Sequence, residues 1–147
     1  MKVMTPLKVL LVEDDHLQAS LISDTLERAF PYITVEQIRT ENEFRSRINK
    51  IKSSPPDIVV MDVMLKWTNP SRELVEPPPT VREGGYAKAG LRCVEMLAGQ
   101  EDLKHIPVIL FTVLSFDDLE SLPDGILYLS KESPPDELVG RIRSAVT

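Results

Sequence analysis

Runs of apolar residues mark five strand-like segments along the chain, and helix-like segments lie between them. The strand-like segments are Leu7–Val12, Ile33–Ile38, Ile58–Met61, Ile106–Thr112 and Ile126–Leu129. The run at Ile58–Met61 is unbroken, which suits a strand that is covered on both faces. The alternation in Ile33–Ile38 suits a strand at the edge of a sheet. Strands that alternate with helices predict a parallel sheet with helices on both faces, a doubly wound α/β fold.

Helical periodicity is clearest in the first half of the chain. The segment His16–Phe30 predicts an amphipathic helix whose apolar residues fall on one side. Those residues are Leu17, Leu21, Ile22, Leu26, Ala29 and Phe30. Thr40 and Glu43 fit a capping box, which predicts a short second helix that continues to Ile51.

The second half predicts one regular helix, one very short one and a C-terminal one. A helix begins at Gly90 and is closed by Gly99. The segment Phe116–Leu122 allows a short helix at best, because Pro and Gly flank it. Ser133 as the cap, with Pro134 at the first helical position, predicts the start of the last helix.

The interval Lys66–Ala89 shows neither a helical nor a strand period. It contains Pro70 and the triplet Pro77-Pro78-Pro79, which favours a local polyproline II segment. So long a connection without regular structure is unusual in a compact domain. We therefore expect a Pro-rich insert at about residues 66–89, either a tolerated surface insertion or a surface for partner recognition or dimerisation.

Composition narrows the class of protein. The chain has 147 residues, of which 42% are hydrophobic and 27% charged, as in one soluble globular domain. A net charge of −6 argues against nucleic-acid binding through a basic surface. The single Cys93 cannot form an internal disulfide, and His16 and His105 are too far apart in sequence to suggest a zinc site. No apolar run reaches membrane-spanning length, so we expect a cytoplasmic protein without direct membrane contact.

Polar residues follow four of the predicted strands. They are Glu13 and Asp14, then Asp62, then Thr112, and finally Lys131. The carboxyl ends of parallel strands share one rim, where open α/β sheets bind their ligands. Acids that hold Mg²⁺, an Asp nucleophile, a hydroxyl and a Lys together suit phosphoryl transfer. The alternatives are a solvated acidic turn and an Asp62 that only caps the next turn.

In these residues the chain resembles the receiver domain of bacterial two-component response regulators, from about Leu7 to Val146. The matching stretches are Val9-Leu10-Leu11-Val12-Glu13-Asp14-Asp15, Asp62-Val63-Met64-Leu65, Ile106-Pro107-Val108-Ile109, Thr112 and Tyr128-Leu129-Ser130-Lys131. The resemblance implies a flavodoxin-like receiver fold, with a five-stranded sheet in the order 2-1-3-4-5.

The resemblance also implies residue roles. Asp62 would accept a phosphoryl group from a histidine kinase or a phosphotransfer protein, assisted by Thr112 and Lys131. Mg²⁺ would be bound by Glu13, Asp14, Asp62 and the main-chain carbonyl of Met64. Thr112 and Tyr128 would report phosphorylation to the face formed by the fourth helix, the fifth strand and the last helix.

The chain departs from the family pattern in four places. Lys66 stands where the family usually has a Pro. The Lys66–Ala89 segment is about twenty residues longer than the family's loop, whereas connections between elements commonly have about 2–6 residues. Glu132 replaces the Pro after the Lys, so a cis peptide is not expected there. The Thr112–Lys131 interval is short, which truncates the fourth helix.

We therefore expect a stand-alone receiver domain over residues 1–147, which is not an enzyme and acts through phosphorylation-dependent binding of a downstream protein. We expect no output domain after the last helix, and we allow for a homodimer. One alternative is a pseudo-receiver that serves as a constitutive interaction module. Another is an aspartyl-nucleophile phosphatase, which needs a second carboxylate where Met64 stands.

Overall fold

The computed structural model describes residues 6–68, 76–119, 122 and 125–146. Five parallel strands form one sheet in the order β2-β1-β3-β4-β5, which confirms the predicted topology. The strands are β1 Leu7–Val12, β2 Ile33–Ile38, β3 Ile58–Met61, β4 Val108–Thr112 and β5 Ile126–Ser130. All strands run in the same direction, so their carboxyl ends meet at one rim.

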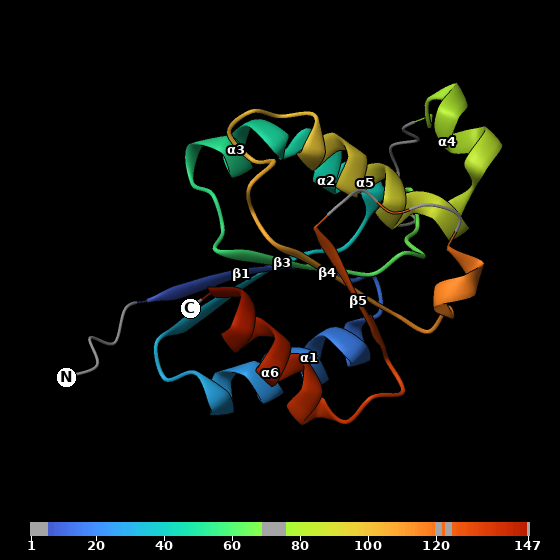
Figure 1. Cartoon of the computed structure of the whole chain (residues 1–147). Helices are drawn as coiled ribbons and strands as arrows, with labels where there is room; N and C mark the ends of the chain where they lie inside the picture. The colour runs from blue at the N-terminus through green and yellow to red at the C-terminus, as the bar shows by residue number, and fades with distance from the viewer. Residues whose placement is uncertain (1–5, 69–75, 120–121, 123–124, 147) are drawn as a thin grey trace.

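Helices cover both faces of this sheet (Figure 1). On one face lie α1 His16–Ala29 and α6 Pro135–Val146. On the other lie α2 Glu41–Ser46, α3 Ile48–Ser53 and α5 Ala89–Ala98. The helix α4 Pro79–Gly84 and the 3₁₀ turn η1 Tyr86–Lys88 lie at the end of the molecule where the strands finish. The predicted three-layer α/β architecture is thus confirmed.

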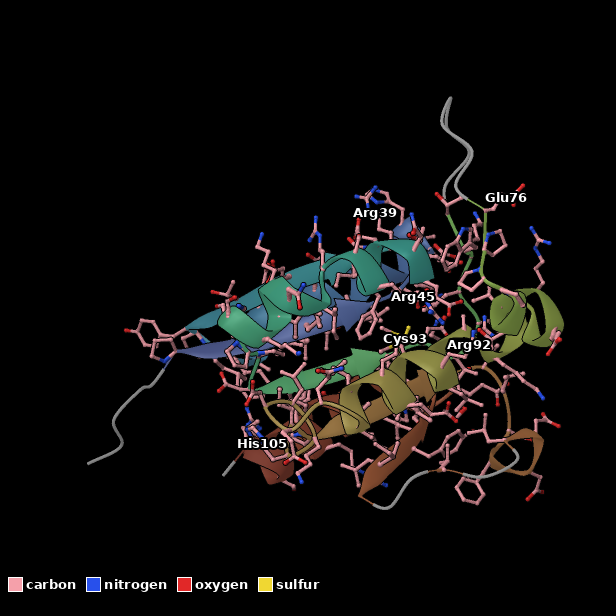
Figure 2. All side chains as sticks on the ribbon, turned by 90° about the horizontal axis from the view of Figure 1, so that it is seen from above. Arg39, Arg45, Glu76, Arg92, Cys93 and His105 are labelled. Carbon is pink, nitrogen blue, oxygen red and sulfur yellow. The ribbon has the colours of Figure 1, made fainter. Side chains whose placement is uncertain are left out.

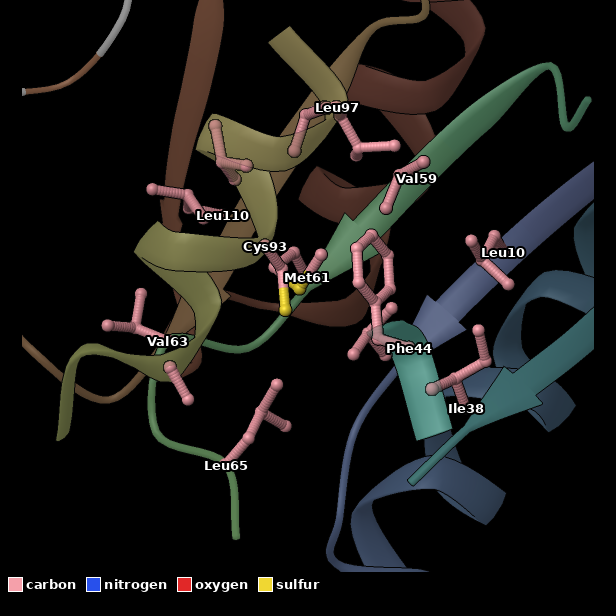
Figure 3. Close-up of a cluster of buried hydrophobic side chains, with 14 of the residues drawn as sticks. Leu10, Ile38, Phe44, Val59, Met61, Val63, Leu65, Cys93, Leu97 and Leu110 are labelled. Carbon is pink, nitrogen blue, oxygen red and sulfur yellow. The ribbon is translucent and has the colours of Figure 1, made fainter. Parts of the chain in front are cut away.

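The central strands divide their side chains between two cores, because successive residues of a strand point to opposite faces. Toward α2, α3 and α5 point Leu10, Val12, Val59, Met61 and Leu110, which pack with Phe44, Cys93 and Leu97 (Figure 3). Toward α1 and α6 point Val9, Leu11, Val60 and Ile109. Both sets are buried, which explains why these strands read as unbroken apolar runs.

Helix α1 corrects one sequence prediction. Asp15 caps it, accepting hydrogen bonds from the main-chain N–H groups of residues 17 and 18. Its buried residues are Ala19, Ile22 and Leu26. Leu17 and Leu21, which were expected on the inner side, are 68% and 55% exposed. Ala19 lets the helix approach the sheet closely, so the core side is rotated away from the two leucines.

Other boundaries shift by a few residues. The predicted second helix is two helices, α2 and α3, because the chain bends at Arg47, where φ is −98° and ψ is 3°. Helix α6 begins at Pro135, one residue later than predicted, and the carbonyl of Pro134 accepts a hydrogen bond from the N–H of Glu137. Among the described residues no peptide is cis, as expected after Lys131.

The region of the insert contains regular structure that the sequence reading missed. Pro78 has the polyproline II geometry expected of the triplet, with φ −60° and ψ 159°, but Pro79 already begins α4. Val81 of α4 is buried, and Gly85 ends the helix with φ 69°. A six-residue helix is too short to show a period. Pro70 and its neighbours at 69–75 lie outside the described residues.

The truncated fourth helix agrees with the prediction. Between β4 and β5 the described residues contain one 3₁₀ turn, η2 Phe116–Asp118. Ser115 and Asp118 form its capping box. Within the described part of the chain, no helix has the length and apolarity needed to cross a membrane.

Gly90 is the position where α5 touches the strand end that carries Asp62. Its N–H donates to the carbonyl of Val63 at 2.7 Å. A Cβ atom on Gly90 would lie 2.0 Å from the Asp62 carbonyl oxygen and 2.6 Å from the Cα of Val63. Both neighbours are main chain, which cannot rotate away as a side chain can. Only Gly therefore fits at this contact.

We predict that Gly90→Ala destabilises the fold by about 1–3 kcal/mol, since overpacking forces the main chain to shift. The matched control is Gly140→Ala, where the added methyl group meets no heavy atom within 4 Å apart from the neighbouring main chain of its own helix. That change in α6 should stabilise the fold by about 0.5–1 kcal/mol. Urea unfolding of both variants measures the difference, and equal midpoints would contradict the close packing at Gly90.

Candidate functional site

The site lies at the rim where β1, β3, β4 and β5 end. Val12 pairs with Met61, so the next residues along these strands, Glu13 and Asp62, emerge side by side. Thr112 pairs with Ser130, which places Lys131 beside them. An open cavity at this point is lined by Glu13, Asp14, Gln18, Asp62, Met64 and Lys131, among others. The predicted site residues other than Thr112 and Tyr128 thus surround one cavity.

Three carboxylates converge in this cavity. Glu13, Asp14 and Asp62 each offer an oxygen atom, and these atoms all lie within 4.8 Å of one another. Glu13 and Asp62 are buried, with 1% and 7% of their surface exposed, whereas Asp14 is half-buried. Carboxylate oxygens are the ligands that Mg²⁺ prefers in proteins, and an open cavity leaves room for its water ligands. The donor set therefore fits a magnesium ion.

Lys131 is a cation that lines the cavity and contacts two of its carboxylates. Its main-chain N–H donates to the Thr112 carbonyl at 2.9 Å, which fixes the residue at the end of β5. Its Nζ donates to Asp62 Oδ2 at 2.8 Å and also to Glu13 Oε1. Burial alone lowers the pKa of Lys131, but the hydrogen bonds to Asp62 and Glu13 outweigh it and raise the pKa above its ordinary value.

Glu13 is electrostatically the most perturbed of the three acids. Burial, followed by the charge of Asp62, raises its pKa from 4.5 to about 7, and the hydrogen bond from Lys131 opposes this only in part. One lysine therefore does not neutralise both buried carboxylates. A divalent cation would supply the missing positive charge.

The main chain orients the Asp62 carboxylate. The Asp62 N–H donates to the Val12 carbonyl at 2.9 Å, which continues the ladder between β1 and β3. Its Oδ1 atom accepts a hydrogen bond from the Val63 N–H at 2.7 Å. Because Oδ2 is held by Lys131, both oxygens have fixed positions beside the cavity. Met64, two residues further, lines the same cavity.

Thr112 and Tyr128 are placed differently from the other predicted residues. Thr112 is fully buried, and its Oγ1 accepts a hydrogen bond from the Leu114 N–H at 3.2 Å. The Tyr128 hydroxyl donates to the Leu114 carbonyl at 2.6 Å, and its ring meets Phe116 edge to face at 5.5 Å. Both residues therefore hold the loop after β4, with Leu114 as their common partner. The sequence reading gave Leu114 no role in this contact.

Two further groups at the site were not predicted from the sequence, the Gln18 side chain and the Lys66 main-chain N–H. Gln18 lines the cavity from the first turn of α1, three residues after the capping Asp15, and that spacing was its only signal. The Lys66 N–H donates to Asp14 Oδ2 at 3.2 Å. A main-chain donor of this kind leaves no trace in side-chain patterns.

No protein-family model matches the chain. A relative among known proteins, the polar-differentiation response regulator DivK of Brucella anthropi, is 28% identical over 142 residues, which cover 95% of each chain. The signal receiver domain of a signal transduction histidine kinase from Syntrophus aciditrophicus is 26% identical, with a TM-score of 0.63, over 95% of this chain and 89% of that one. The relatives and structural neighbours of the present chain are thus response-regulator receiver domains.

A third comparison bears on the cavity at the rim of this chain. The receiver domain of a sensor histidine kinase from Pseudomonas aeruginosa has a TM-score of 0.69 at 19% identity, covering 97% of this chain and 98% of that one. In that structure a magnesium ion is coordinated in the active-site cleft. The predicted fold and the predicted resemblance to receiver domains are thus confirmed. The cluster of Glu13, Asp14 and Asp62 offers the oxygen ligands that a magnesium ion prefers.

The raised pKa of Glu13 predicts how Mg²⁺ binding depends on pH. Without metal, the folded chain keeps the Glu13 proton between about pH 4.5 and 7, where the unfolded chain releases it, so the stability that Glu13 contributes falls as pH rises through this window. Mg²⁺ needs the ionised carboxylate. Its affinity should therefore rise by up to about tenfold per pH unit below pH 7 and level off above it.

Calorimetric titration with Mg²⁺ in buffers of different ionisation heat measures both the affinity and the proton released. Glu13→Gln is the control, because it has no proton to release and should remove the pH dependence of the remaining affinity. An affinity that stays level from pH 6 to pH 7 would contradict the raised pKa, since binding would then displace no proton.

Proposed function

We propose that this receiver domain accepts a phosphoryl group on Asp62 from a histidine kinase or a phosphotransfer protein, in a reaction that requires Mg²⁺. The observation that carries the proposal is the fixed Asp62 carboxylate at the cavity, with Lys131 on one oxygen and the Val63 N–H on the other. A nucleophile held in place before the donor arrives loses little entropy in the reaction.

The chemistry follows from these contacts. An Asp62 oxygen attacks the phosphorus atom of a phosphohistidine, an O–P bond forms, and the N–P bond of the donor breaks with its electron pair remaining on the imidazole. Lys131 is placed to hold a phosphoryl oxygen. When bound by Glu13, Asp14, Asp62 and the Met64 carbonyl, Mg²⁺ supplies positive charge to the phosphoryl oxygens. The product is an acyl phosphate on Asp62.

Intact mass spectrometry after incubation with a small phosphodonor and Mg²⁺ tests the acceptor. We expect one phosphoryl adduct on the wild type and none on Asp62→Asn or in the presence of a chelator. The matched control is Asp57→Asn, because Asp57 lies at the start of β3, where it accepts a hydrogen bond from the Lys8 N–H. A pseudo-receiver would give no adduct with any variant, and an adduct of undiminished yield on Asp62→Asn would assign the acceptor elsewhere.

The proposed output is phosphorylation-dependent binding of a downstream protein by a single cytoplasmic domain that is not itself an enzyme. Self-association is a second form that the same output could take. The loop after β4 supports an output by binding, because Thr112 and Tyr128 both form hydrogen bonds with Leu114 in this loop. Val113 and Phe116, on either side of Leu114, are 59% and 58% exposed. A movement of this loop would therefore alter an apolar surface next to the phosphorylation site.

The two exposed leucines of α1 support a docking surface for the phosphodonor protein. Leu17 and Leu21 are one helical turn apart, so their side chains are neighbours on the helix surface. Leu17 lies in the same turn as Gln18, which lines the cavity. A donor whose histidine reaches Asp62 must also cover the helix that begins beside it. Exposed leucines there are suited to such a contact.

We predict that the double variant Leu17→Ser, Leu21→Ser slows phosphoryl transfer from the protein donor about tenfold, which corresponds to about 1.4 kcal/mol of lost binding. Labelling by a small phosphodonor should not change, since the chemistry at Asp62 is intact. The control is Tyr32→Ser, an equally exposed apolar residue at the amino end of β2, 57% accessible. Equal losses with both phosphodonors would instead indicate damage to the fold.

A further inference from the structure

The main chain of Lys66, called here the Lys66 peptide, lies between Asp14 of the acidic cluster and helix α2. Its N–H donates to Asp14 Oδ2 at 3.2 Å, and its carbonyl accepts from the Glu41 N–H at 3.0 Å. The next carbonyl, that of Trp67, accepts from the Asn42 N–H at 2.9 Å. The segment that leaves the rim after Met64 is thus fastened to α2 on one side and to Asp14 on the other.

Glu41 is itself held by a buried ion cluster. Its carboxylate is fully buried and receives two hydrogen bonds from Arg92, at 2.8 Å and 2.6 Å, in a bidentate arrangement. Arg45, one turn further along α2, donates two more to the same carboxylate, at 3.3 Å and 3.1 Å. Figure 2 shows Arg45 and Arg92 reaching into the space between α2 and α5, next to Cys93. Such a paired and buried carboxylate cannot move without exposing unpaired charge.

The two arginines also hold the insert. Arg92 donates to the Gly85 carbonyl at 2.8 Å, at the end of α4. The Arg45 guanidinium lies over the Trp67 ring, 5.8 Å from its centre. A continuous path of contacts therefore runs from Gly85 through Arg92 and Glu41 to the Lys66 peptide and on to Asp14.

We propose that the Lys66 peptide is a positioning group for the Mg²⁺ site: its N–H orients the Asp14 carboxylate, and the buried Glu41 cluster fixes the peptide in place. The inference rests on the proposed function only for the identity of the metal. A proline at this position, the residue usual in the family that the sequence resembles, has no N–H and cannot make this contact. The contact is thus specific to chains with another residue at position 66.

The test compares Lys66→Pro with Lys66→Ala. Both variants remove the lysine charge, so they differ in the N–H group and in the ring that fixes the main chain of proline. Mg²⁺ binding is measured by calorimetry without any phosphodonor. We expect Lys66→Pro to bind Mg²⁺ about tenfold more weakly than Lys66→Ala, the low end of what changes behind metal ligands produce. At saturating Mg²⁺ the adduct yield on Asp62 should be the same for both variants.

A second variant acts from the other end of the path, in case proline disturbs folding. Arg92→Lys keeps the charge but cannot hold both Glu41 oxygens and Gly85 at once. It should weaken Mg²⁺ binding and speed amide exchange at Lys66 and Glu41. Its control is Glu76→Gln, which removes the charge from the exposed pair with Arg82 and leaves the Glu41 cluster intact. Protection of Cys93 from thiol reagents confirms that each variant is folded, because native Cys93 is buried and its pKa is raised by burial.

The outcomes separate the two proposals. Weaker Mg²⁺ binding by Lys66→Pro than by Lys66→Ala, or weaker binding together with faster exchange in Arg92→Lys, supports the positioning role. Wild type that binds Mg²⁺, with equal affinities for the two Lys66 variants and for Arg92→Lys, overturns this inference alone. A wild-type chain that binds no Mg²⁺ overturns the proposed function and this inference with it.

Discussion

The hydrogen bonds of one lysine with two buried carboxylates are the interaction on which the rim depends. Lys131 joins Asp62 and Glu13, and all three side chains are less than a tenth exposed. A carboxylate without a partner is costly to bury, so the two acids could not stand at the strand ends without this lysine. One cation does not balance two anions, however. Burial is the main reason that the pKa of Glu13 is raised, and the neighbouring charge of Asp62 adds to it. That uncompensated negative charge also makes the cavity suited to a divalent cation.

A second buried cluster, around the carboxylate of Glu41, has the opposite balance of charge. Glu41 has two arginines for one acid, and four hydrogen bonds join them. The hydrogen bonds to Glu41 raise the pKa of Arg92, against the effect of burial. A cluster in which the cations outnumber the acid has no need of a metal ion, and it is suited to holding structure. The two clusters thus have different roles at the rim. The acid-rich cluster of Glu13, Asp62 and Lys131 faces the cavity, and the arginine-rich cluster around Glu41 fixes the segments beside it.

The sequence predicted the strands and the rim residues because both follow from local order: an apolar run defines a strand, and the residue after it reaches the rim. It misplaced Leu17 and Leu21 because the period of a helix does not say which of two apolar sides meets the sheet. The side that does so contains Ala19, Ile22 and Leu26. The Glu41–Arg92 pair spans 51 positions, and no local pattern connects such partners. The sequence also cannot show which main-chain N–H groups act as donors at the site, as that of Lys66 does, since every residue except proline has one.

Glu41 also explains how a long insert fits at the edge of a small domain. The start of the insert meets the cluster directly, through the Lys66 carbonyl on the Glu41 N–H and through Trp67 under Arg45. Its end meets the same cluster through Arg92, which holds the Gly85 carbonyl. Closing a long loop costs entropy that grows only slowly with its length, so fixing both ends at one rigid point limits the cost whatever lies between them. Among the described residues, both ends of the insert are therefore linked to Asp14 by contacts that pass through Glu41 and the main chain of Lys66.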